Sequence, residues 1–292
     1  MQHHVKNFKR WLKLLNFAEI TVYNDPKYIK NFLDYLETTG IKEIREIENR
    51  HIKEYYDYLK VRPNKRKPGA LSQNTIISNI NAIKRFTKYL RETQQEHITV
   101  NIKPERLKTE ITILTPAEIQ TLYKACKNDI LGYRDRAMLS IYYGCGLRRT
   151  EGIQLNTEDI NKNKSIILIK KGKGNRQRYI PISKQVKEDL ENYNNKARIY
   201  LTKTGNEKAL FLSQRSKRIS GNSMITRLKQ LLIKAELSEE KIKSTGLHTL
   251  RHSIATHLLN SGMTLENVSR FLGHRSLEST QIYTHISKHE EL

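Results

Sequence analysis

Apolar residues recur at helical spacing through most of this chain, which points to a mainly α-helical fold. Four such stripes lie within residues 1–105, and each places its members on one face of a helix. Gly40 fits the C-terminal end of the second helix, and Ser72 fits the N-cap of the fourth. The stripes are Phe8, Trp11, Leu12 and Leu15; Tyr28, Ile29, Phe32, Leu33 and Leu36; Ile47, Ile52, Tyr55, Tyr56 and Leu59; and Ile76, Ile80, Ile83, Phe86, Tyr89 and Leu90.

The helical period stops after this first domain. The sequence N-I-K-P-E-R-L-K-T-E-I-T-I-L over residues 101–114 is polar and contains Pro104. Thr115 and Glu118 then form a T-x-x-E capping box, with Pro116 at the favoured first helical position. We therefore predict a first domain over residues 1–105, a linker over 106–114 and a second domain over 115–292.

One strand–turn–strand pattern interrupts the helices of the second domain. S-I-I-L-I at 165–169 and Q-R-Y-I-P-I at 177–182 flank the turn K-K-G-K-G-N, which predicts an antiparallel hairpin. A basic hairpin at a sheet edge is the simplest interpretation, and a nucleotide-binding P-loop is poorly supported because no Gly-Lys-Ser/Thr follows. We also expect helices over residues 183–200 and 222–235, and a short strand at 210–212.

The stretch from Leu247 to Ile286 concentrates chemically useful side chains. His248 and Arg251 lie three apart on a predicted helix, which ends near Gly262, and a second helix ends at Gly273 before His274. Tyr283 follows after a short polar link. Two imidazoles, a guanidinium and a phenol are suited to attack on a phosphodiester, because they supply hydrogen bonds, positive charge and a nucleophile.

The same stretch offers a competing metal hypothesis. His248 with His252, and His285 with His289, have the i, i+4 spacing that suits zinc. No HExxH motif or nearby cysteine pair accompanies them, and Arg251 would compete for the same helix face. We therefore predict no metal site, and a structural role for His252 and His257.

Charge and cysteine content narrow the functional classes. Lys and Arg total 53 against 30 Asp and Glu, which gives a formal net charge of +23 and a pI near 9.9. Such an excess favours nucleic-acid binding, although acidic membrane surfaces would also attract it. The two cysteines lack a CxxC spacing and no apolar run is long enough to span a membrane, so we expect a cytoplasmic, nucleoid-associated protein without membrane partners.

The chain resembles the tyrosine recombinases, the integrase family that includes the Xer enzymes and lambda integrase. The matching motifs are H-T-L-R-H at 248–252, L-G-H at 272–274, Y-T-H at 283–285, G-L-R-R-T-E at 146–151 and G-K-G-N-R-Q-R at 172–178. The resemblance implies a mainly α fold with a small antiparallel β-sheet. It also implies an N-terminal four-helix core-binding (SAM-like) domain, which would clamp DNA, and a C-terminal catalytic domain.

The resemblance also assigns roles to individual residues. It implies Tyr283 as the nucleophile, with the catalytic side chains Arg148, Lys173, His248, Arg251 and His274, and Glu151 as the orienting partner of Arg148. A slip of one residue would nominate Arg149, but the spacing to Glu151 favours Arg148. The family usually has an aliphatic residue where this chain has Gly152, which leaves the local helix packing open.

On the first domain, the polar face of the fourth helix supplies candidate DNA contacts. These are Asn74, Asn79, Lys84, Arg85 and Lys88. The alternative is a plain helical bundle whose basic residues only make it soluble.

The activity implied is cutting and rejoining of double-stranded DNA at an inverted-repeat core site, through a 3′-phosphotyrosyl intermediate and a Holliday junction. No cofactor is implied. The implied assembly is a homotetramer on synapsed DNA that associates weakly without DNA, with accessory proteins as further partners. The alternatives are a type IB topoisomerase-like nicking-resealing enzyme and a non-catalytic DNA-binding regulator on the same fold.

Overall fold

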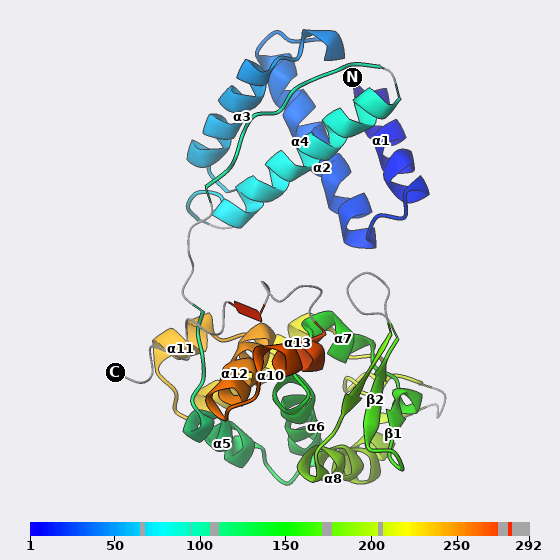
Figure 1. Ribbon diagram of the computed structural model, residues 1–292, viewed down its shortest axis with the longest axis vertical. Coiled ribbons are helices and arrows are strands. Elements are labelled where there is room, and N and C mark those ends of the chain that lie inside the picture. The colour runs from blue at the N-terminus through cyan, green and yellow to red at the C-terminus, as the bar shows by residue number, and fades with distance from the viewer. Residues whose placement is uncertain are drawn as a thin grey trace. The chain divides into compact units, whose positions relative to one another are not determined.

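The computed structural model describes residues 1–64, 68–93, 95–105, 111–170, 177–203, 207–273 and 280–281. The chain divides into two compact units, Met1–Thr109 and Glu110–Leu292 (Figure 1). Each unit has its own hydrophobic core. The helices of both units and the small sheet confirm the predicted mainly α fold with an antiparallel sheet.

The first unit is built from four long helices in its described residues, as the apolar stripes predict. They are α1 (Gln2–Leu14), α2 (Glu19–Thr38), α3 (Asn49–Val61) and α4 (Gln73–Glu92), with a short 3₁₀ turn at Ile44–Glu46. Members of all four stripes form the core, among them Phe8, Phe32, Tyr55 and Phe86. Leu15 is an exception because it follows the end of α1 and is 51% exposed.

The predicted helix ends of this unit are confirmed. The Ser72 hydroxyl accepts a hydrogen bond from the Thr75 amide at 3.3 Å, which is the expected N-cap of α4. Gly40 follows α2 with φ +89°, a conformation in which a side chain would be strained.

The second unit contains the remaining described helices. They are α5 (Pro116–Ala125), α6 (Ile130–Leu139), α7 (Arg149–Gln154), α8 (Lys184–Tyr193), α9 (Ile199–Leu201), α10 (Gly221–Lys234), α11 (Glu239–Ser244), α12 (Leu247–Asn260) and α13 (Leu265–Leu272). The capping box of Thr115 and Glu118 opens α5 as predicted, with the Thr115 amide donating to Glu118 at 2.8 Å. A π-helical turn, Ser140–Gly144, continues α6, and another, Asn194–Arg198, joins α8 to α9.

The sheet has three antiparallel strands in the order β1 (Ile160–Asn161), β2 (Ile166–Ile169) and β3 (Arg178–Pro181). Strands β2 and β3 confirm the predicted hairpin, with Ile167 opposite Ile180 in the buried layer. The strand predicted at 210–212 is wrong. Ala209 and Leu212 make only isolated bridges, to Asn156 and Arg218, so their apolar side chains fill the core without joining a ladder.

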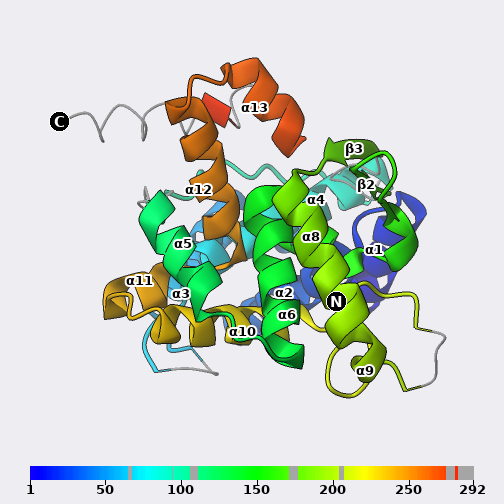
Figure 2. The same cartoon turned by 90° about the horizontal axis from the view of Figure 1, so that it is seen from below.

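Helix α12 packs against the π turn that follows α6, and α13 lies beside one end of α12 (Figure 2). Buried Leu247 and Leu250 attach α12 to the main core of the second unit, and Ala255 packs with Val268 and Leu272 of α13, so α12 holds its polar side chains in place. Both cysteines, Cys126 and Cys145, are buried free thiols. Among the described helices, none combines the length and the apolar character needed to cross a membrane.

Candidate active site

Arg251 ties three segments of the second unit together. It projects from α12, is 3% exposed, and donates from Nη1 to the Gly146 carbonyl at 2.6 Å and from Nη2 to the Leu272 carbonyl at 2.7 Å. The first acceptor belongs to the turn before α7 and the second to the end of α13. A planar guanidinium reaches two such acceptors from two separate nitrogens, whereas a lysine would have to reach both from a single nitrogen.

Arg148, at the N-cap of α7, reaches the same end of α13. Its Nη2 donates to the Gly273 carbonyl at 2.8 Å, next to the carbonyl that Arg251 binds. Its Nη1 donates to Glu151 Oε1 at 2.8 Å, and its backbone amide donates to Glu151 Oε2 at 2.9 Å. The expected contact between Arg148 and Glu151 is therefore present, and the fold brings together two guanidiniums that are 103 positions apart in the sequence.

Two glycines allow this close approach. Gly146 has φ +58°, and a Cβ there would lie 2.9 Å from Leu272 Cδ2. Gly273, with φ +65°, ends α13 in a left-handed cap, and a Cβ there would lie 2.6 Å from Arg178 Nε. The glycines of G-L-R and L-G-H thus set the distance between the two segments.

Arg178 is a site residue that the sequence analysis did not single out. It opens β3 and donates to Glu151 Oε1 at 2.8 Å and to Oε2 at 2.9 Å. Burial alone would raise the pKa of Glu151, but the hydrogen bonds and charge of Arg178, with the hydrogen bonds of Arg148, outweigh it and lower that pKa to about 2. The available signal was its place as the last residue of the G-K-G-N-R-Q-R motif, from which the sequence analysis named only Lys173.

His248 occupies the first turn of α12, near the arginines. Partial burial of its ring, followed by the positive charges of Arg251 and Arg148, lowers its pKa from the ordinary value. The imidazole is therefore neutral at physiological pH and can accept a proton. Elsewhere on α12, His257 Nδ1 lies 2.9 Å from the Tyr143 hydroxyl, in keeping with a structural role.

Arg149, the alternative to Arg148, is engaged elsewhere. Its Nη2 donates to Asn222 Oδ1 at 2.8 Å, on α10. The open question about Gly152 is also answered, because the ring of Tyr142 fills the space that a side chain would need.

Three predicted site residues, Lys173, His274 and Tyr283, lie outside the described residues. Lys170, at the described end of β2, contacts Asp159 at 2.7 Å and Glu158 at 2.6 Å. Hydrogen bonds to Asp159 and then Glu158 raise the pKa of Lys170 to about 12, which makes it a poor proton donor. No cluster of three or more metal-ligating His, Cys, Asp or Glu side chains occurs in the part of the chain that the structure describes.

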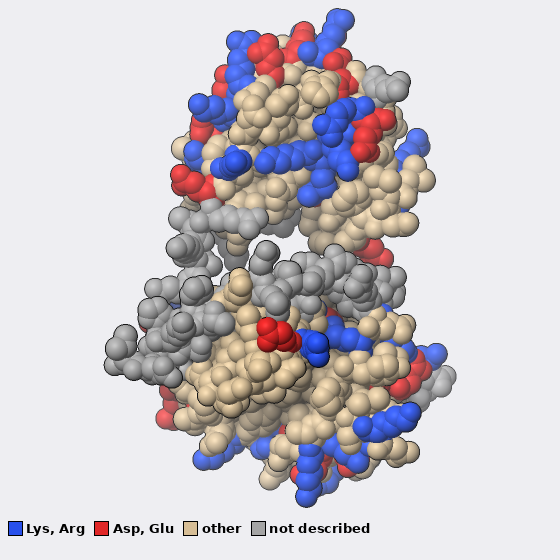
Figure 3. Space-filling model, in the orientation of Figure 1, with Lys and Arg blue, Asp and Glu red and all other residues tan. Residues whose placement is uncertain are grey.

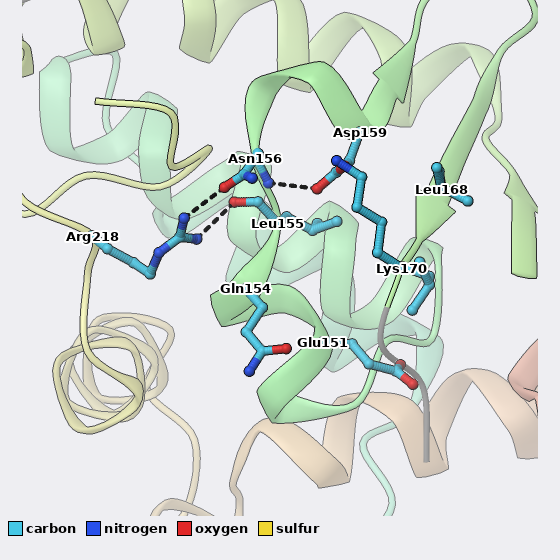
Figure 4. Close-up of a pocket in the computed structure, with 9 residues that line it drawn as sticks. Glu151, Gln154, Leu155, Asn156, Asp159, Leu168, Lys170 and Arg218 are labelled. Carbon is cyan, nitrogen blue, oxygen red and sulfur yellow. Dashed lines mark hydrogen bonds and ion pairs between the residues drawn. The ribbon is translucent and has the colours of Figure 1, made fainter. Parts of the chain in front are cut away.

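A pocket of about 290 Å³ lies beside Glu151, between α7 and β2 (Figure 4). Arg218 borders it and donates to the carbonyls of Ile153 at 2.8 Å and Leu155 at 2.9 Å, which holds the C-terminal end of α7. Its lining is Glu151, Gln154, Leu155, Asn156, Asp159, Leu168, Ile169, Lys170 and Arg218. The hydrogen bonds of Arg218 at the edge of this pocket stabilise α7, the helix that carries Glu151.

On the first unit, Lys and Arg side chains gather over α4 (Figure 3). Lys84, Lys88 and Arg91 line a groove of about 300 Å³ there, together with His97. The expected position of Asn79 on the polar face is wrong. It is 1% exposed and donates to the Thr75 carbonyl at 2.8 Å, because its helical position faces the core.

The other candidates on α4 differ in whether their side chains are exposed or already paired within the first unit. Asn74 is exposed, whereas Arg85 donates to the buried Asp25 of α2 at 2.5 Å and serves the packing of the unit. Lys88 remains half exposed beside Glu92.

Comparison with known proteins decides the family. The model of the phage integrase family matches residues 112–290, and the model of the phage integrase N-terminal SAM-like domain matches residues 5–97. The chain belongs to the phage integrase family. The match also confirms the predicted SAM-like first domain and catalytic second domain.

Members of the family with curated names are similar along most of the chain. The tyrosine recombinase XerD of Staphylococcus epidermidis is 34% identical over 284 residues, which cover 94% of this chain and 92% of that protein. The tyrosine recombinase XerC of Chlamydia trachomatis is 36% identical over 221 residues, 74% of this chain and 68% of that protein. The solved Tn1549 transposon integrase, with circular intermediate DNA, covers 99% of this chain and 98% of its own at 20% identity, with a TM-score of 0.74, and agrees in fold.

These relatives confirm the enzyme class predicted from the motifs, a tyrosine-type site-specific recombinase. They do not favour the nicking-resealing enzyme or the non-catalytic regulator.

Proposed function

We propose that this recombinase cuts and rejoins double-stranded DNA at an inverted-repeat core site, with Tyr283 as its nucleophile. One observation carries the proposal. Arg148 and Arg251 converge on the neighbouring carbonyls of Gly273 and Leu272, at the point where the chain enters His274. Two buried or half-buried guanidiniums at one position are suited to the non-bridging oxygens of a scissile phosphate.

The proposed reaction exchanges one phosphodiester for another. The Tyr283 oxygen attacks phosphorus, a 3′-phosphotyrosyl bond forms, and the bond to the 5′ oxygen breaks. Lys173 gives a proton to that leaving oxygen, and the phenol proton passes to His248, whose lowered pKa keeps it neutral beforehand. His274 adds a hydrogen bond to the phosphate. Attack by the 5′ hydroxyl of another strand reverses these bond changes, and two such exchanges pass through a Holliday junction, so no energy-supplying cofactor is needed.

The first unit supplies the proposed clamp on the duplex. Lys84, Lys88 and Arg91 form a basic groove on α4, and phosphate contacts by such residues bind DNA without reading its sequence. The exposed Asn74, at the start of the same helix, remains a candidate for a base or phosphate contact. This role would associate the protein with the nucleoid.

The decisive experiment compares wild type with Tyr283→Phe. Each protein is expressed in the host, the lysate is denatured, and DNA still attached to protein is sequenced. Tyr200→Phe is a matched control, because Tyr200 is 69% exposed on α9. We expect adducts from wild type and Tyr200→Phe and none from Tyr283→Phe. Adducts from Tyr283→Phe would refute the assignment of the nucleophile.

We further propose that four protomers assemble on two synapsed duplexes and that the free protein associates weakly. Cutting both strands of two duplexes requires four nucleophiles. Light scattering should give a monomer mass for free protein and a tetramer only with DNA that carries the recovered site, with or without accessory proteins. A stable tetramer of free protein would contradict this.

A further inference from the structure

Arg178 and Arg148 share one buried carboxylate, that of Glu151, whose side chain is 2% exposed. We propose that Arg178 is a positioning residue, which holds Glu151 so that Arg148 keeps both its direction and its charge for the phosphate. The inference rests on the proposed function and adds a residue to that site.

Arg178 makes more of the side-chain hydrogen bonds to the Glu151 carboxylate than Arg148 does. Arg178 binds both oxygens as a fork, through Nη1 to Oε1 at 2.8 Å and Nη2 to Oε2 at 2.9 Å. The Arg148 side chain contacts only Oε1, through Nη1 at 2.8 Å, and its Nη2 is left to reach the Gly273 carbonyl at 2.8 Å. Because Arg178 occupies the end of the carboxylate, Arg148 cannot turn to form the bidentate pair that an isolated Arg and Glu prefer.

Charge leads to the same conclusion. Arg148 and Arg178 carry two positive charges and Glu151 one negative charge, so the three side chains together keep a net positive charge near the proposed phosphate position. Without Arg178, Arg148 and Glu151 would form a neutral pair in a largely buried site, where charges are weakly screened. The stabilisation of the extra charge that the phosphate gains in its transition state would then fall.

The place of Arg178 in the fold is also specific. It is the first residue of β3 and lies opposite Ile169 in the ladder, so it sits at the base of the hairpin. Its Nε is buried and, within the described residues, makes no hydrogen bond, and it lies where a Cβ on residue 273 would be 2.6 Å away. Because Gly273 has no side chain, the Arg178 guanidinium fits beside it. Arg178 therefore connects the base of the hairpin to α7, through Glu151, and packs against the end of α13.

The experiment uses full-length protein and a nicked duplex that carries the sequence recovered from wild-type adducts. Two quantities are measured for Arg178→Met and Arg178→Lys: the single-turnover rate of covalent complex formation at saturating duplex, and the dissociation constant for the same duplex. Thermal unfolding is recorded in parallel. Arg178→Lys keeps the charge without the fork, so it remains informative if Arg178→Met fails to fold.

Arg227→Met is the matched control for lost stability. Arg227 binds the buried Asp135 with several hydrogen bonds, as Arg178 binds Glu151, and its side chain is 22% exposed against 16% for Arg178. It lies on α10, and the hydrogen bonds that the structure describes for it go to Asp135 and Gln230, neither of which is a candidate site residue. A loss of rate caused only by a weakened fold would appear in both variants.

We expect Arg178→Met to slow covalent complex formation by roughly 10- to 100-fold, the scale of a mispositioned catalytic group. Its dissociation constant should stay near that of wild type, Arg178→Lys should recover part of the rate, and Arg227→Met should lower the melting temperature with little change in rate. Equal slowing in Arg178→Met and Arg227→Met, or a wild-type rate in both Arg178 variants, would overturn the inference. Absence of adducts from wild type would instead refute the proposed function, and the role of Arg178 with it.

Discussion

The phenol ring of Tyr142 occupies the space beside the Cα of Gly152. A Cβ on Gly152 would lie 2.6 Å from both Cζ and Oη of Tyr142. The Tyr142 hydroxyl donates to the Arg149 carbonyl at 3.1 Å, so the ring is held against α7. Gly152 is thus matched by a bulky neighbour on the π turn.

Gly152→Ala should therefore destabilise the second unit. The Tyr142 ring is fully buried and hydrogen-bonded to α7, and overpacking of this kind costs about 1–3 kcal/mol in the free energy of unfolding. Urea denaturation measures the change. Gly246→Ala is the control, since a Cβ at Gly246 meets nothing within 4 Å and should cost less than about 1 kcal/mol. Equal effects of the two substitutions on the free energy of unfolding would show that the Tyr142 ring moves to make room for the new methyl group.

Arg251→Lys should impair both stability and chemistry. The single ammonium nitrogen of a lysine does not reproduce the two separate nitrogens that bind the Gly146 and Leu272 carbonyls, and a buried carbonyl without a partner costs about 1–3 kcal/mol. If Arg251 also binds phosphate, covalent complex formation should fall by roughly 10²- to 10³-fold, as with other lost transition-state donors. The two losses are measured by urea denaturation and by the yield of DNA adducts. An unchanged yield would remove Arg251 from the proposed chemistry.

Stability should decline in mild acid through His252. Burial, with smaller effects of His248 and Arg251, lowers the pKa of His252 to about 4. An unfolded histidine takes up a proton near pH 6.5, so between pH 6.5 and 4 the unfolded chain binds more protons and the free energy of unfolding falls. The loss should be of order 1–3 kcal/mol. In His252→Gln, the free energy of unfolding should change less between pH 6.5 and 4. A decline as steep as that of wild type would show that other groups cause it.

Asp135→Asn should be among the more destabilising single changes in the second unit. Asp135 is 1% exposed, accepts from Arg227 Nε at 3.0 Å, and lies 3.7 Å from Arg134 Nη2. Loss of the carboxylate leaves the buried Arg134 and the partly buried Arg227 without their counterion, at a cost of about 3–5 kcal/mol.

The control for Asp135→Asn is Asp34→Asn. Asp34 pairs with Lys30 at 2.9 Å on the surface of α2, with 43% of its side chain exposed. An exposed pair of this kind should contribute less than about 1 kcal/mol. Chemical denaturation measures both variants, and a small effect at Asp135 would show that water reaches the buried arginines.

Local signals in the sequence were sufficient for most of the secondary structure. Helical spacing predicted α1 to α4, the capping box at Thr115 predicted the start of α5, and the glycine turn predicted the pairing of β2 with β3. Each of these depends on interactions within a few residues. The errors arose where burial decides, as in the strand expected at 210–212 and the face assigned to Asn79.

The candidate site divides in the same way. The motifs alone nominated Arg148, Glu151, His248 and Arg251, because chemistry depends on residue type and order along the chain. The sequence could not reveal that Arg178 shares the carboxylate of Glu151, 27 positions away, or that both arginines hold the carbonyls at the end of α13. Those contacts exist only after the hairpin, α7 and α13 have packed together, since no local pattern encodes the partner of a long charged side chain.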